Sequence, residues 1–135
     1  MESKNNDNTF INFLNDYNEC FYNKDLVGLK EFYDTKDNVL IYFDNHKNND
    51  TYTLKEHLEL ISNFFEKGKS TESGEVEPLI IENLNVFHKG ETACLCFISK
   101  YKSFPVPEVR STLYLEYMDN KWKIIHAHFS FQPEK

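Results

Sequence analysis

Apolar residues in the first part of the chain recur at three- and four-residue steps, the period of an amphipathic helix. The apolar run that starts at Phe10 predicts a helix over residues 9–23, after a polar segment, residues 1–8, that we expect to be disordered. Asp25 can cap a short second helix, predicted over residues 26–33, because its carboxylate can accept from the free backbone amides at a helix start.

A strand and a third helix follow. Residues 39–43 are aliphatic and aromatic and predict a strand. Thr53 and Glu56 form a capping box, in which the threonine oxygen and the glutamate carboxylate each accept from a backbone amide. A helix should therefore begin there, and Gly68 supplies the left-handed conformation that commonly ends one.

The second half of the chain lacks a helical period and predicts four strands joined by turns. These strands cover residues 79–87, 91–101, 109–117 and 121–131. Helices followed by an antiparallel meander, with one early strand inserted, make an α+β domain. A chain of 135 residues fits one such domain, which we expect over residues 9–135.

Composition limits the class of protein. The formal net charge is −7, and the chain has one arginine and no basic run, which argues against a nucleic-acid binder and against binding to anionic membranes. No stretch approaches the roughly 20 apolar residues of a membrane span, and the N-terminus lacks the apolar core of a signal peptide. The three cysteines fit no disulfide framework. The sequence therefore predicts a cytoplasmic protein.

Residues suited to binding or catalysis are concentrated in the last two strands. These strands contain the only arginine, the only tryptophan and two of the five histidines. Because alternate residues of a strand share a face, Arg110, Thr112 and Tyr114 form one polar stripe. A second stripe is formed by Trp122, Ile124, His126 and His128. Polar and aromatic groups within such apolar strands predict a lined pocket.

The pocket requires both stripes to lie on one face of the hairpin. A two-residue loop, Asp119-Asn120, would separate them, whereas a three-residue loop that starts at Met118 unites them and sets Arg110 opposite His128. A type I′ turn needs positive φ at both central residues and usually has glycine at the second. Because glycine is missing here, we favour the three-residue loop.

In that register the other face of the hairpin is apolar and should also be buried. We expect the polar face to line a cavity under the helices and the apolar face to close a homodimer. The reverse assignment of the two faces stays open.

The order of elements and the C-terminal motif resemble a known family. The motif is Arg110-x-Thr112 followed by Trp122-Lys-Ile-Ile-His126-x-His128-Phe-Ser130. Over about residues 9–131 the chain resembles the SnoaL-like branch of the NTF2-like superfamily, and it is similar to the association domain of calcium/calmodulin-dependent kinase II. The resemblance implies a cystatin-like cone, in which a curved sheet wraps about three helices around a cavity at the wide end, usually in a dimer. Its members include isomerases, dehydratases, cyclases, binding proteins and assembly modules, so the fold is implied better than the activity.

Several residues are candidates for chemistry. A buried Arg110 could anchor a carboxylate or another polar ligand atom, or form a structural ion pair with Glu108, Glu116 or a partner subunit. His126 and His128 could act as acid or base, or simply form hydrogen bonds in the core. Relatives similar to ketosteroid isomerase place a catalytic carboxylate near the position of Asp44, although a solvated turn is the alternative there.

A metal site is not expected. Cys94 and Cys96 would have to join His126 and His128, but one strand separates the two pairs. Two strand spacings are about 9.5 Å, against metal–ligand bonds of about 2.0–2.3 Å. We therefore expect both cysteines to be small core residues.

We predict a small-molecule-binding protein of the SnoaL-like type, without a cofactor, whose ligand is a small polar or aromatic organic molecule. The predicted pocket residues are Tyr17, Arg110, Thr112, Tyr114, Trp122, His126 and His128. One alternative is a cofactor-free isomerase or dehydratase with His126 or Asp44 as the base, so whether the chain is an enzyme stays open. Another is an oligomeric assembly module with a vestigial pocket.

Overall fold

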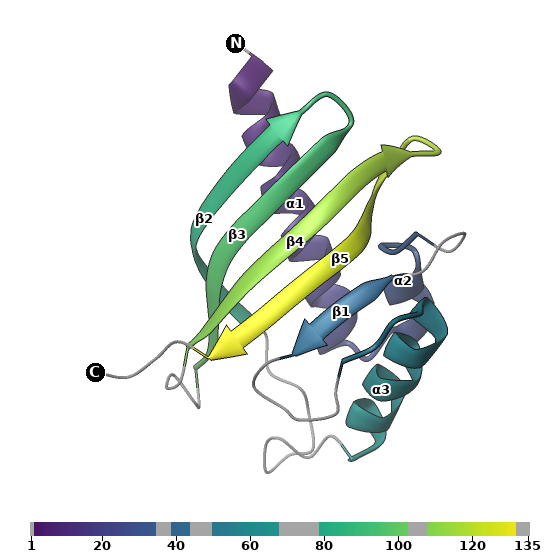
Figure 1. The fold of residues 1–135 in the computed structure, drawn as a ribbon. Helices are drawn as coiled ribbons and strands as arrows, with labels where there is room; N and C mark the ends of the chain where they lie inside the picture. The colour runs from purple at the N-terminus through teal and green to yellow at the C-terminus, as the bar shows by residue number, and fades with distance from the viewer. Residues whose placement is uncertain (1, 35–38, 44–49, 68–78, 103–107, 132–135) are drawn as a thin grey trace.

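The computed structural model describes residues 2–34, 39–43, 50–67, 79–102 and 108–131. The elements are α1 (Glu2–Tyr22), α2 (Leu26–Lys30), β1 (Leu40–Phe43), α3 (Leu54–Lys67), β2 (Leu79–Lys89), β3 (Thr92–Tyr101), β4 (Val109–Met118) and β5 (Lys121–Phe131). The strands form one open, curved sheet in the order β1-β5-β4-β3-β2. α1 lies across one face of the sheet, and α2 and α3 lie beside β1 (Figure 1). The predicted α+β architecture is confirmed. None of the described helices is both long and apolar enough to cross a membrane.

The first two helices meet at a tight junction. Lys24 adopts a left-handed φ of 59°, and the Asp25 amide donates to the Cys20 carbonyl at 2.8 Å, which closes the end of α1. The Asp25 carboxylate then accepts from the Gly28 amide at 2.9 Å and caps α2, as predicted. α1 begins at Glu2, which corrects the expected disorder of residues 1–8, because extending an existing helix costs little free energy.

The third helix starts where the capping box predicts. Thr53 Oγ1 accepts from the Glu56 amide at 3.1 Å, and the Glu56 carboxylate accepts from the Tyr52 amide at 2.9 Å. The predicted C-terminal stop, Gly68, lies outside the described residues.

The core lies between α1 and one side of the sheet. Phe10 and Leu14 of α1 pack in one cluster with side chains of β1, β3, β4 and β5. The sheet residues of that cluster are Ile41, Ala93, Leu95, Phe97, Leu113, Leu115, Ile124 and Ala127. We call this side of the sheet the inner face. The opposite side, which carries Cys94, Cys96, Thr112, Tyr114, His126 and His128, is called the open face.

The β4–β5 hairpin turns through two residues. Met118 pairs with Lys121, and Asp119 and Asn120 have φ values of 55° and 66°. The predicted three-residue loop is therefore wrong, because aspartate and asparagine supply both left-handed positions without glycine.

A bulge then shifts the register. Leu115 pairs with Ile124, but Tyr114 pairs with His126, so Ile125 is the extra residue on β5. Beyond the bulge, Thr112 lies opposite His128 and Arg110 lies opposite Ser130 rather than His128. The stripe that contains Thr112 thus shares a face with His126 and His128, but through a different register. Trp122 and Ile124 precede the bulge and lie on the other face, so the second stripe is split.

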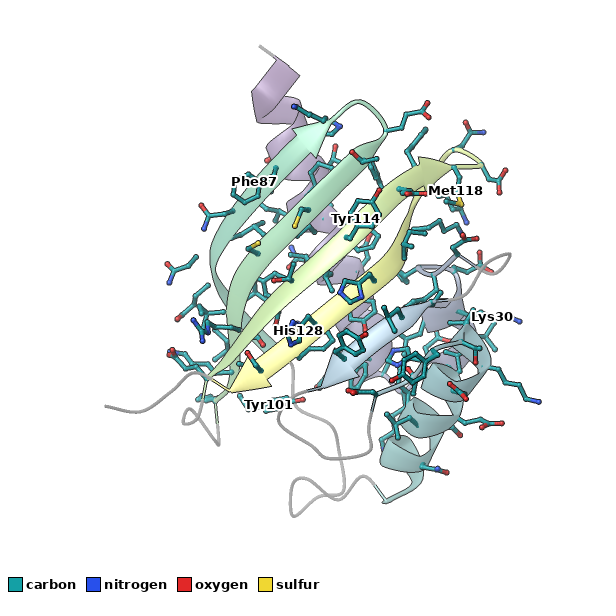
Figure 2. All side chains as sticks on the ribbon, viewed as in Figure 1. Lys30, Phe87, Tyr101, Tyr114, Met118 and His128 are labelled. Atoms are coloured by element: carbon teal, nitrogen blue, oxygen red, sulfur yellow. The ribbon has the colours of Figure 1, made fainter. Side chains whose placement is uncertain are left out.

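The assignment of that shared face was wrong. The apolar face of the hairpin lies under α1, and the polar residues of the open face, Tyr114 and His128 among them, point away from the helix (Figure 2). The position of the apolar face under α1 agrees with the reverse assignment, which the sequence left open. The cause is apolar burial, because Leu113, Leu115, Ala127 and Phe129 leave water only if they face the helix.

Candidate functional site

A chain of hydrogen-bonded polar side chains crosses the apolar interior between the helices. Tyr17 Oη lies 2.8 Å from Tyr33 Oη, and Tyr33 Oη lies 3.0 Å from His57 Nε2. Tyr33 is 1% exposed and His57 is 3% exposed. Buried polar groups need such partners, so the three side chains fix one another's positions.

Each member of the chain comes from a different segment. Tyr17 lies on the face of α1 that continues from Phe10 and Leu14. Tyr33 follows α2, and its segment pairs with β5, where the Ile124 amide donates to the Phe32 carbonyl at 2.7 Å. His57 lies on the buried side of α3.

Burial controls the charge of all three groups. It raises the pKa of Tyr17, although the hydrogen bond to Tyr33 opposes the rise. It raises the pKa of Tyr33 well above its ordinary value, with a further contribution from the Tyr17 phenol. It lowers the pKa of His57 to about 4, because the charged imidazolium is poorly solvated in the interior. The chain is therefore uncharged at neutral pH.

An uncharged chain of this kind can point its hydrogen bonds in either direction. If His57 Nε2 accepts from Tyr33, then Tyr33 accepts from Tyr17, and the Tyr17 oxygen keeps lone pairs that can accept. If His57 Nε2 donates, the order reverses and the Tyr17 hydroxyl has a proton to donate. Within the described residues Tyr33 is the hydrogen-bond partner of Tyr17, so Tyr17 is the end of the chain with spare capacity.

The inner face of the sheet adds two buried hydroxyls. Ser99 of β3 and Ser111 of β4 are 4% and 3% exposed, and Ser111 pairs with Phe97 across the sheet. Ser111 Oγ has no hydrogen-bond partner among the described residues. Burying a hydroxyl without a hydrogen bond costs free energy. Ser111 Oγ can therefore form a hydrogen bond with a polar ligand atom or a water molecule.

The structure brings most of the sequence-predicted site residues to the open face. Arg110 is exposed there, and no ion pair joins it to Glu108, Glu116 or another of the described residues. Tyr114 Oη donates to Glu116 Oε2 at 2.7 Å. His126 Nδ1 lies 2.8 Å from the Leu40 carbonyl.

Three predicted residues lie elsewhere. Trp122 precedes the bulge, so it is on the inner face, where its ring packs edge-on against Phe10 at 5.0 Å between centroids. Tyr17 is on the inner side, as expected of a helix-borne wall residue. Asp44 lies outside the described residues.

Sequence reasoning missed Tyr33 and His57. His57 carried a signal, because it lies three residues after Leu54 and four before Ile61, on the apolar face of α3. The sequence signal for Tyr33 was weaker, because its burial depends on pairing with β5, a contact between segments far apart in the sequence.

Other features of the described residues give no stronger site. No group of three histidine, cysteine or acidic side chains is placed to hold a metal ion there. A groove of about 500 Å³ lies between α2 and α3. It is lined by Leu26, Lys30, Leu54, Lys55, Leu58, Glu59 and Ser62.

Solved structures share the fold at low sequence identity. A protein from Streptomyces avermitilis, whose name proposes a dehydratase of the NTF2-like family, has a TM-score of 0.79 and 12% identity, covering 98% of this chain and 99% of its own. A protein of unknown function from Pectobacterium atrosepticum has a TM-score of 0.73 and 13% identity, covering 93% and 89%. A cystatin-like protein of unknown function from Nostoc punctiforme has a TM-score of 0.69 and 7% identity, covering 93% and 90%.

These likenesses show the NTF2-like, cystatin-like fold. Among curated proteins, none matches the sequence. The SnoaL-like domain family matches residues 11–134, which is nearly the whole chain and agrees with the resemblance in the C-terminal motif. The chain therefore belongs to the SnoaL-like domain family.

Proposed function

We propose that this SnoaL-like domain binds a small polar or aromatic organic molecule between α1 and the inner face of the sheet. The observation that carries the proposal is the buried Tyr17–Tyr33–His57 chain, which ends at a Tyr17 hydroxyl with unused hydrogen-bonding capacity. Ligand sites of this kind are mostly apolar with a few placed polar groups, and the inner face has that composition.

The inner face also limits the charge of the ligand. Along the described strands, the inner face carries no aspartate, glutamate, lysine or arginine. Burying a charged group against such a surface costs several kcal/mol unless a counter-charge is present. The ligand that fits best is therefore neutral, with a hydroxyl or carbonyl that meets Tyr17 and, on the sheet side, Ser111.

Binding fits the chain better than acid–base catalysis. A general acid or base works best with a pKa near the operating pH. Burial moves the pKa of His57 down to about 4 and the pKa values of both tyrosines upward, so all three groups move away from neutrality. The isomerase or dehydratase alternative then rests on Asp44, because His126 lies on the open face.

A ligand search with two matched variants tests the proposal. Small molecules extracted from the purified protein are identified by mass spectrometry, and a panel of neutral phenols and carbonyl compounds is screened by thermal shift. We expect Tyr17→Phe to weaken binding of the best compound about tenfold, which corresponds to one hydrogen bond.

Tyr22→Phe is the matched control, because Tyr22 is an exposed phenol on the same helix. Equal affinity in wild type, Tyr17→Phe and Tyr22→Phe would overturn the assignment of the site. An absence of binding by the whole panel, together with an empty extract, would overturn the function itself.

We also propose that the chain forms a homodimer through the open face. Four strands of ten or eleven residues and the four-residue β1, spaced about 4.8 Å apart, present roughly 700 Å², close to the area that one partner contributes to a stable interface. The face mixes rings and polar groups, including Phe87, Tyr114 and His128, and Phe87 is 63% exposed (Figure 2). In this proposal Arg110, Thr112 and His126 belong to the pairing surface rather than to the ligand site.

A further inference from the structure

Two thiols lie side by side on the open face of the sheet. Cys94 and Cys96 alternate with the buried Ala93, Leu95 and Phe97 along β3, so both point away from α1. Both are half-buried free cysteines, which corrects the expectation that they are core residues. They lie apart from the proposed ligand site, which is on the other side of the sheet.

The strand keeps this pair from forming an unstrained disulfide. Residues two apart in a strand are about 6.7 Å apart, and their parallel Cα–Cβ bonds keep the Cβ atoms almost as far apart. A disulfide needs Cβ atoms about 3.5–4.5 Å apart. The two sulfur atoms can lean toward each other, however, and span the roughly 4.6 Å that two collinear metal–sulfur bonds of about 2.3 Å require.

The neighbours of the pair supply no further strong ligand. Across the sheet, Cys94 lies opposite Tyr114 and Cys96 lies opposite Thr112. On the other side, β2 places Phe87 opposite Cys94 and an asparagine opposite Cys96. His126 and His128 are one strand beyond β4, about 9.5 Å away, so they cannot complete the set.

We propose that Cys94 and Cys96 bind one copper(I) ion in a two-coordinate site. Thiolates are the soft ligands that select copper(I), and copper(I) accepts two ligands in a line. Zinc in a protein takes four donors, or three and a water molecule, which this surface does not offer. The site is a second one, distinct from the proposed interior ligand site, and it does not depend on that proposal.

Binding of copper(I) to the two thiols needs neither an oxidant nor a reductant. Both thiols lose a proton, two copper–sulfur bonds form, and copper stays in the +1 state. Affinity should therefore rise with pH, because the metal has to displace these protons.

An anaerobic competition titration tests the site. Copper(I) is added to the protein in the presence of a coloured copper(I) chelator, at a protein concentration at which light scattering shows a monomer, since the open face is also the proposed pairing surface. We expect one equivalent per chain and an ultraviolet thiolate-to-copper absorption. Cys94→Ser and Cys96→Ser should each weaken binding by a factor on the order of 100 or more, because the second bond is intramolecular.

Cys20→Ser is the matched control. Cys20 is the third free thiol, near the end of α1, with its sulfur 3.9 Å from the Asp25 carboxylate. It should leave both stoichiometry and affinity unchanged. Binding that survives Cys94→Ser or Cys96→Ser at full strength would overturn the proposal. Loss of binding in Cys20→Ser would also overturn it, as would a wild-type affinity no higher than that of a single thiol. Circular dichroism of each variant shows whether a loss of binding is caused by misfolding.

Discussion

Burial beside Tyr33 keeps the His57 imidazole neutral, and this makes folding sensitive to pH. The pKa of His57 falls from 6.5 to about 4 in the folded protein. Between these values the unfolded chain binds more protons than the folded one, so stability rises with pH. The free energy of unfolding should therefore drop as pH falls from about 6.5 to about 4, by as much as about 3 kcal/mol.

His57→Leu should remove this part of the pH dependence. The measurement is urea unfolding at several pH values between about 7 and about 4.5, with the slope of stability against pH compared between wild type and variant. His88→Leu is the control, because His88 packs on Phe10 and Trp122 at the other end of the core. An identical slope in wild type and His57→Leu would contradict the account of His57.

At the residue scale, the sequence predicted one end of the polar chain and missed the other. Tyr17 falls on the apolar face of α1 by its spacing alone. A histidine with apolar neighbours at helical spacing, such as His57, is a core position that the same rule could have identified. Tyr33 could not be assigned, because its hydrogen bonds depend on α1, α3 and β5 meeting around it.

At the scale of elements, one carboxylate separates the first two helices. Asp25 accepts from the Gly28 amide and so satisfies a donor that α2 cannot satisfy itself. Asp25→Ala should lower the free energy of unfolding by about 1 kcal/mol. Asp16→Ala, an exposed position within α1, is the control and should change stability by less than about 0.5 kcal/mol. Thermal unfolding is measured for wild type, Asp25→Ala and Asp16→Ala. A loss of stability in Asp25→Ala alone is due to the missing helix cap, whereas an equal loss in both variants would be due to the missing negative charge.

The hairpin turns give a paired prediction about backbone strain. Asn120 has a φ of 66°, a conformation that glycine adopts at no steric cost, so Asn120→Gly should stabilise the protein by about 0.5 kcal/mol. Gly90 has a φ of 55° in the β2–β3 hairpin, and a Cβ there would meet no atom within 4 Å. Gly90→Ala should therefore destabilise by about 1 kcal/mol through the backbone alone. Equal shifts in both variants would contradict this reasoning.

The β4–β5 hairpin shows which feature of the elements could not be predicted from local sequence patterns. The strands and the capping box followed from local patterns, and their bounds in the structure agree closely. The register did not follow, because the bulge at Ile125 is set by long-range contacts, and the isolated turn sequence does not encode it. Compared with the predicted hairpin, the loop is one residue shorter and β5 has one extra residue at the bulge. The two differences cancel, so Thr112 and His128 lie on the same face, as predicted.

At the scale of the whole molecule, the choice of the face that the helices cover decides where the proposed ligand site and the proposed pairing surface lie. Both faces of β4 and β5 carry aromatic or apolar side chains, so the sequence alone favours burying each of them. The helices can cover one face only (Figure 1), and the more apolar face is the one covered. Arg110, His126 and His128 are left on the open face, where we propose that a partner binds.

Ile98→Lys tests whether that partner is a second copy of the chain. Ile98 lies on the open face, opposite Arg110 on β4 and opposite Glu82 on β2, so Ile98→Lys would replace an apolar side chain of the proposed pairing surface with a charged one. In a two-fold pair both added lysines would be taken out of water, and the cost of burying these charges opposes association. Light scattering across a dilution series should show a dimer for wild type and a monomer for Ile98→Lys. Ile11→Lys, on the exposed side of α1, is the control and should remain dimeric. A monomeric wild type, or a dimer that Ile98→Lys leaves intact, would remove the open face as the pairing surface.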